Sequence, residues 1–405
     1  MSRKLVGIPI EDDSRASKYL DFLRFFAALT VLVQHLSPTF GVAGAPPGTG
    51  VWLKDFIKLS IYEWSQSGFK FVMVFFVLSG FFVSSSVLKM IDNDRWSWRI
   101  YLTNRLTRLW IVLIPALLLT VAWKYIQYHL FGMGDESLIT TDLRWTTFLG
   151  NVFFLQGIRG VHLFGHNGPL WSLSFEFWYY ILFPCIVLAI KSPKWITRLI
   201  YTVATAVIAW FVGIGVIGMF PVWLLGSLLV MVRTIRINSV LIATMLILVS
   251  LALDVLSVNS TIYNYLLGSH IPIVSNPLSL IPALLPNMVV GISFSITIYL
   301  VLCFFNNKSL QVSSWNPYRK LAGFSYSLYL LHYPTMDFFY ELKRSKWWHF
   351  PRELNFYHWF PVVALIVIIY SWIISLLTEA RTDKLRRFIL RLISNKNEIG
   401  KVKNI

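Results

Sequence analysis

Two ionisable side chains mark the first long apolar segment, KYLDFLRFFAALTVLVQHLS. Arg24 and His35 are eleven residues apart, which at about 100° per residue brings them to within about 20° of each other on a helix. Asp21 joins the same stripe three residues before Arg24. An imidazole can act as a base near neutral pH, so this face could carry chemistry. The alternative is that Arg24 pairs with Asp21 at one end of the helix and His35 lies at the other interface.

A second polar face runs through GPLWSLSFEFWYYILFP. Ser172, Glu176 and Tyr180 are spaced four residues apart and therefore share one side of a helix. A carboxylate inside an apolar helix either pairs with a cation or becomes neutral. Either state suits proton transfer or the orientation of a histidine. The alternative is a hydrogen bond that only ties helices together.

A third polar face lies in SYSLYLLHYP, where Tyr329 and His332 form an i, i+3 pair and Ser325 falls on the same side. A direct chemical role for His332 competes with a role as a hydrogen-bonding partner in helix packing. In FFVLSGFFVSSS, Ser79 and the glycine after it form a notch of small residues. Another helix or a substrate can approach closely there.

The basic pair Arg105 and Arg108 precedes the next apolar run as RLTRLW. Their i, i+3 spacing lets both guanidinium groups face one anion, and arginine suits phosphate because it donates two hydrogen bonds at once. The alternative is a topology signal or a contact with anionic lipid. The sequence has no glycine-rich phosphate loop, no G-x-S-x-G motif and no zinc signature. We therefore expect no metal and no bound cofactor.

The elements that must position these residues are membrane helices. The chain is 56% hydrophobic and only 14% charged, against roughly 25% charged residues in soluble domains. The net charge of +17 comes mainly from short loops between apolar runs, which indicates membrane topology and not a nucleic-acid partner. We expect an all-α integral membrane protein with both termini in the cytoplasm. The ten predicted spans are 18–37, 68–89, 107–130, 168–190, 196–217, 219–232, 239–258, 284–305, 320–341 and 357–378.

One membrane domain, 18–378, is expected between a cytoplasmic segment, 1–17, and a basic cytoplasmic tail, 379–405. The sixth span is short for a full crossing, so it is either tilted or partly re-entrant.

Five motifs in the same order resemble the acyltransferase-3 family of membrane O-acyltransferases, which modify sugars of bacterial surface and secreted glycans. They are the Arg24–His35 spacing after LDFLRFFAAL, then FFVLSGFF, RLTRLW, GPLWSLSFEFWYYILFP and SYSLYLLHYP. The resemblance implies that His35 is catalytic together with Arg24, that Arg105 and Arg108 lie on the acyl-CoA side, and that Glu176 belongs to the site. The predicted supporting residues are Asp21, Ser79, Ser172, Tyr180, Tyr329 and His332. Many relatives have a more polar run where this chain has FEFWYY, which leaves the roles of Tyr179 and Tyr180 open.

The resemblance implies an acyl-CoA donor, with acetyl-CoA as the default, and a glycan or lipid-linked glycan acceptor such as O-antigen or exopolysaccharide. It also implies a multi-pass protein of the bacterial inner membrane, surrounded by lipid. Some members carry a fused extracellular hydrolase-like domain, which we do not expect here. Two alternatives stay open. One is a transporter or flippase for a lipid-linked sugar, and the other is a membrane acyltransferase of a different family that acts on a lipid or protein.

Overall fold

The computed structural model describes residues 14–40, 52–131, 143–235, 237, 239–259, 262, 280–305, 317–345 and 359–393. All regular structure in these ranges is helical, as expected for an all-α membrane protein. The principal helices are α1 (Arg15–Leu36), α2 (Trp52–Ser65), α3 (Gly68–Asp92), α4 (Trp98–Phe131), α6 (Trp145–Val152), α7 (Leu170–Lys191), α8 (Trp195–Met231), α9 (Val240–Val258), α11 (Leu280–Phe305), α12 (Pro317–Ala322), α13 (Ser325–Arg344), α14 (Phe360–Leu377) and α15 (Thr382–Ile393).

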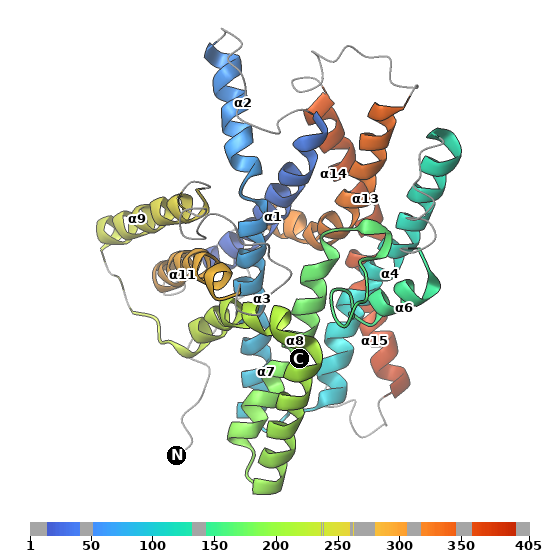
Figure 1. Ribbon diagram of the computed structural model, residues 1–405. Helices are drawn as coiled ribbons and strands as arrows, with labels where there is room; N and C mark the ends of the chain where they lie inside the picture. Colours follow the sequence, from blue (N-terminus) through green and yellow to red (C-terminus); the bar gives the residue numbers. More distant parts are fainter. Residues whose placement is uncertain are drawn as a thin grey trace.

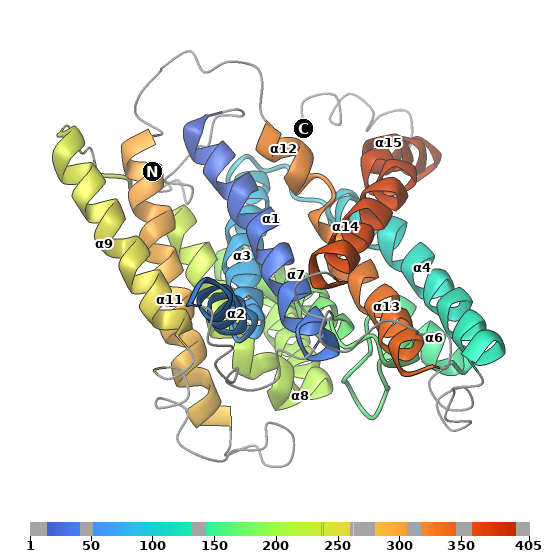
Figure 2. The same ribbon diagram turned by 90° about the horizontal axis from the view of Figure 1, so that it is seen from above.

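The helices α1 and α3 occupy the middle of the bundle. In both views they lie between α9 and α11 on one side and α4, α13, α14 and α15 on the other (Figures 1 and 2). The apolar stretch of α3 is 72% buried inside the protein, against 22% for α9. The apolar side chains of α9 therefore face outward, as a lipid-facing helix requires.

Seven of the described helices are long and apolar enough to cross a membrane, so the chain is a multi-pass membrane protein. The helices α1 and α13 are not among these seven, because they carry ionisable and polar side chains along their length. The ten crossings, and the cytoplasmic location of both termini, stay predictions. Each of the ten predicted segments falls mainly on helix in the described residues.

Two boundaries differ from the expected spans. The helix α4 begins at Trp98, so Arg105 and Arg108 lie inside this helix and not ahead of it. Backbone hydrogen bonds continue a helix beyond the apolar window that sequence hydropathy detects. The expected span 320–341 is divided into α12 and α13, which are separated by Gly323 and Phe324.

The predicted fifth and sixth spans form one element, α8, which is interrupted at Gly213. This residue has φ 80° and ψ 172°, a conformation that essentially only glycine adopts without strain. The interruption leaves carbonyl groups without their helical partners. The guanidinium group of Arg159 donates to two of them, Trp210 O at 2.8 Å and Phe211 O at 3.0 Å.

The notch at Ser79 and Gly80 receives a helix, α8. A Cβ atom at Gly80 would lie 2.0 Å from the carbonyl oxygen of Trp223, and one at Gly226 would lie 1.9 Å from that of Val77. The two backbones are thus in direct contact, as small residues allow between membrane helices. The contact brings the indole of Trp223 to Ser79, with Nε1 donating to Oγ at 3.2 Å.

We expect Gly226→Ala to destabilise the fold, because the new methyl group must push α8 away from α3. Overpacking of this kind costs about 1–3 kcal/mol. The matched control is Gly215→Ala in the same helix, where a Cβ atom would meet no neighbour within 4 Å. Thermal unfolding of the detergent-solubilised protein should show a lower midpoint for Gly226→Ala only. Equal midpoints for the two variants would contradict the close contact.

Candidate active site

Two cavities meet inside the bundle and share three arginines. The wider cavity has a volume of about 950 Å³ and opens at the end of the bundle where α1 begins and α14 ends. The narrower cavity, about 90 Å³, extends between α3, α4, α7 and α13. Both are lined by Arg24, Arg105 and Arg108, together with Phe82. The sequence-predicted basic residues therefore lie where the wide space narrows.

The arginines come from two helices, Arg24 from α1 and the other two from α4. The guanidinium of Arg24 lies 5.7 Å from the ring centre of Phe82, and that of Arg105 lies 5.7 Å from the ring centre of Tyr180. None of the three forms an ion pair with a residue in the described ranges. In particular, Arg24 does not pair with Asp21, although both line the wide cavity. Three such guanidinium groups at a constriction form a site suited to an anion.

Further charged residues on the wide cavity were not assigned to the site from sequence. They are Arg319, Lys320, Glu379, Asp383 and Arg386. Only tertiary packing brings them there, because they belong to α12 and to the elements after α14. In sequence, the basic ones could not be distinguished from topology signals.

Glu176 is the acceptor at the centre of the polar network that lines the narrow cavity. One of its carboxylate oxygens, Oε1, accepts hydrogen bonds from Ser79 Oγ at 2.7 Å and from the hydroxyl of Tyr180. Ser79 comes from α3 and Tyr180 lies one turn after Glu176 on α7. The predicted face of Ser172, Glu176 and Tyr180 does line this cavity. It is also lined by the three arginines, so the carboxylate shares one space with them.

At the far end of the narrow cavity, α7 and α13 are joined by a hydrogen bond. Ser172 Oγ and the hydroxyl of Tyr329 are 2.7 Å apart, and each also lies within reach of the carbonyl oxygen of Pro169. Tyr329 lines the cavity together with Ser325, as expected for one face of α13. The ring of Tyr329 in turn lies beside that of His332, with centroids 6.1 Å apart.

The histidines His35 and His332 form a direct pair between α1 and α13. Nδ1 of His35 lies 3.0 Å from Nε2 of His332, and Nδ1 of His332 lies 3.0 Å from the carbonyl oxygen of Leu328. The ring of Tyr333 packs edge-on against His35 at 5.2 Å. His332 is fully buried, whereas His35 is partly exposed. The spacing of the two sequence motifs did not reveal this pairing.

The hydrogen bonds assign the tautomers of two neutral rings. A carbonyl oxygen can only accept, so Nδ1 of His332 carries its hydrogen and its Nε2 is the acceptor. Nδ1 of His35 is then the donor in this contact, and the backbone carbonyl group of Val31, one turn earlier, is a second acceptor for the same ring. The remaining nitrogen of His35, Nε2, is left without a hydrogen and with a free lone pair. The arrangement therefore presents a base, or a nucleophile, at this atom.

His35 and Glu176 are not hydrogen-bonded to each other. Of the two predicted partners of Glu176, His35 is instead in contact with His332, whereas Arg24 lines the same cavity as the carboxylate. Neither histidine lines the two cavities, and the link between them and the narrow cavity is the ring of Tyr329. The narrow cavity is thus connected to His35 only by side-chain contacts among the described residues, from Tyr329 to His332 and from His332 to His35.

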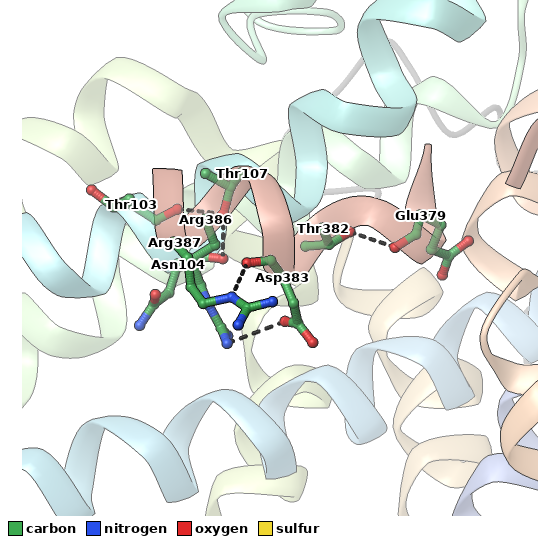
Figure 3. Close-up of polar contacts among 8 residues, drawn as sticks. All are labelled: Thr103, Asn104, Thr107, Glu379, Thr382, Asp383, Arg386 and Arg387. Atoms are coloured by element: carbon green, nitrogen blue, oxygen red, sulfur yellow. Dashed lines mark hydrogen bonds and ion pairs between the residues drawn. The ribbon is translucent and has the colours of Figure 1, made fainter. Parts of the chain in front are cut away.

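A carboxylate after the last long apolar helix holds the start of α13. Glu379, in a short 3-10 turn (Glu379–Arg381), accepts from the backbone N–H of Ser327 at 3.1 Å and from its hydroxyl at 2.9 Å. These bonds satisfy a donor of the first helical turn, which has no partner inside the helix. Figure 3 shows Glu379 beside the first residues of α15. The residue lies in the predicted tail, and its contact with a residue 52 positions away cannot be recognised from sequence.

Comparison with known proteins agrees with the resemblance that the motifs carry. The family described as an acyltransferase domain, acyltransferase-3, matches residues 17–376. Relatives are YrhL of Bacillus subtilis, named as a candidate peptidoglycan O-acetyltransferase (27% identical over 41% of this chain and 23% of the relative), and an O-acetyl transferase of Shigella phage Sf6 (28%, over 44% and 48%). A third is the peptidoglycan O-acetyltransferase OatA of Listeria monocytogenes (21%, over 50% and 30%).

The chain spans less than half the length of each of these three relatives. No solved structure matches it. The family match, however, extends over nearly the whole sequence and includes every residue of the two cavities except those after α14. This protein belongs to the acyltransferase-3 family.

Proposed function

We propose that the protein is a membrane O-acyltransferase that transfers an acyl group, by default acetyl, from acyl-CoA to a sugar hydroxyl of a surface or secreted glycan. The observation that carries the proposal is the His35–His332 pair, which leaves Nε2 of His35 as a free base in a member of an acyltransferase family. The names of the relatives favour acetyl transfer to glycan.

The donor enters from the wide cavity in this proposal. Its volume of about 950 Å³ is at the upper end of the range for small-molecule sites. The phosphates of CoA are anions, and Arg24, Arg105 and Arg108 offer guanidinium groups with no competing ion pair in the described part of the chain. The narrow cavity, about 90 Å³, has room for only a few water-sized groups, which favours a short acyl chain.

The transfer needs one proton acceptor and a leaving thiolate. His35 Nε2 accepts the proton of the sugar hydroxyl as its oxygen bonds to the thioester carbon. The carbon–sulfur bond then breaks, and the CoA thiolate takes the proton from His35. His332 remains an acceptor for Nδ1–H of His35 whether His35 is neutral or charged, so the pair needs no rearrangement during the step.

A covalent route uses the same atom. His35 Nε2 attacks the thioester carbon, the carbon–sulfur bond breaks and the CoA thiolate leaves. A sugar hydroxyl then attacks the acyl group on the imidazole, its proton passes to the CoA thiolate, and the bond to Nε2 breaks to restore the neutral ring. Both routes need the lone pair on Nε2. In either, Glu176 is a positioning residue that holds Ser79 and Tyr180 at the narrow cavity and balances part of the arginine charge.

Purified protein in liposomes should transfer radioactive label from acetyl-CoA to glycan, and His35→Ala should abolish the transfer. Loss of a general base costs about 100-fold or more in rate. The matched control is His129→Ala, an imidazole near the end of α4 that lies outside both cavities. Transfer by His35→Ala at near-normal rate would exclude His35 as base and nucleophile. Movement of glycan across the bilayer without label would favour a transporter.

His332→Ala and His332→Gln should differ in turnover. Alanine removes the acceptor that His332 offers to Nδ1–H of His35 and leaves only the backbone of Val31 to orient the ring. Glutamine keeps a carbonyl oxygen as acceptor. We expect kcat to fall strongly for alanine and to recover in part for glutamine, with KM for acetyl-CoA unchanged in both. If both variants lose stability and activity to the same extent, the role of His332 is packing.

Replacing Arg105 and Arg108 by alanine should raise KM for acetyl-CoA. Each lost charge-assisted hydrogen bond is worth about 1.5–3 kcal/mol, or roughly 10-fold or more in affinity. The control is Arg95→Ala, which removes an exposed arginine from the turn before α4. Initial rates at varied donor and acceptor concentrations give KM for acetyl-CoA and KM for the glycan separately. An effect confined to acceptor KM would contradict the donor assignment.

A further inference from the structure

The helix after the last apolar span, α15, has two faces with different surroundings. One face belongs to the wide cavity, which Thr382, Asp383 and Arg386 help to line. Asp383 and Arg386 are joined by an ion pair of 3.1 Å, and Leu390 on the same side is buried. Figure 3 shows Asp383 and Arg386 on α15 close to the start of α4, whose Asn104 lines the same cavity. This face is therefore a wall of the proposed donor site.

The opposite face of α15 is exposed and carries positive charge beside apolar side chains. Lys384, Arg387 and Arg391 are exposed, and at about 100° per residue they fall within about 60° of one another. Phe388 and Leu392 adjoin them and are 59% and 69% exposed. A helix of this kind lies in the headgroup region of a bilayer, with its apolar side chains below the surface and its basic ones at lipid phosphates.

The helix α15 follows closely after a helix that is long and apolar enough to cross a membrane, so it lies near the bilayer surface. Only the short turn at Glu379–Arg381 separates it from α14, one of the apolar helices long enough to cross a membrane. Glu379 holds that turn to the start of α13, so α15 cannot drift far from the end of the bundle. Positive charge on the exposed face matches the negative surface of a leaflet that contains anionic lipid.

We propose that α15 rests on anionic lipid of the adjacent leaflet and that this contact positions the wall of the wide cavity. The apolar contact is made by Phe388 and Leu392, and the phosphate contacts by Lys384, Arg387 and Arg391. Removal of anionic lipid then loosens the wall that carries Arg386 and weakens donor binding. This second effect rests on the proposed function, whereas the lipid contact does not.

The lipid contact can be measured on the full-length protein in nanodiscs of phosphatidylcholine alone or mixed with phosphatidylglycerol. A nitroxide is attached at Leu392→Cys, since both native cysteines are buried. In the mixed bilayer we expect the label to be accessible to oxygen and shielded from a water-soluble nickel chelate, and less shielded in phosphatidylcholine. A label that reads as water-exposed in both bilayers overturns the proposal, as does spin–spin broadening that shows a second copy of the chain instead.

The charge contribution is tested by the triple variant Lys384→Gln, Arg387→Gln and Arg391→Gln, labelled at the same position. In this variant the nitroxide should be equally shielded from the nickel chelate in both bilayers. The matched control, Lys89→Gln, Lys191→Gln and Lys194→Gln, removes the same charge from exposed positions elsewhere at this end of the bundle and should keep the difference. Loss of the difference in both variants would mean that total charge, and not α15, responds to the lipid.

Donor KM in the two bilayers tests the effect on the cavity. For the wild type we expect KM for acetyl-CoA to be several-fold lower with phosphatidylglycerol, and for the α15 triple variant to be the same in both bilayers. A shielded label with a lipid-independent KM would overturn the link to the cavity. Absence of transfer under every condition would count against the proposed function and leave the label measurement standing.

Discussion

The backbone contact between α3 and α8 is the constraint on which the polar interior depends. At Gly80 and Gly226 the two helices approach so closely that neither position has room for a methyl group. This proximity places Ser79 between the indole of Trp223 and the carboxylate of Glu176. In a bilayer a buried carboxylate must be satisfied by other protein groups, and here they are Ser79 of α3 and Tyr180 of its own helix. The glycines therefore determine where a charged group can be held inside the bundle.

The helix α13 connects the remaining parts of the site. Its first turn is held by Glu379, its middle is joined to α7 by Tyr329 and Ser172, and its next turn meets α1 through His332 and His35. Its backbone also accepts from Asn167, at Leu330 O. Each bond is local, but together they fix α13 against α7 and α1. Ionisable groups that would be costly in isolation are in this way distributed over several helices.

Periodicity predicted which side chains share a helix face, and it did so well for Ser172, Glu176 and Tyr180, which line one cavity. Hydropathy located the helices because long apolar runs leave few other structures in a membrane. The sequence could not show which faces meet, because the His35–His332 contact joins residues 297 positions apart. It also missed Glu379 and Arg386, since polar residues beyond an apolar span have no pattern that distinguishes a cavity wall from a solvated tail.

The difference in width between the two cavities has a consequence for the membrane itself. The wide cavity has a volume of about 950 Å³. If it continued through the bundle as a water-filled pore, the protein would dissipate ion gradients across the membrane. Beyond the arginines it narrows to about 90 Å³ between side chains that include Phe75, Phe76 and Val83. Neither cavity is lined by His35 or His332, so the space that the described residues enclose does not extend to the histidine pair. The bundle is thus hollow at one side, and its described residues line no continuous wide passage to the histidine pair.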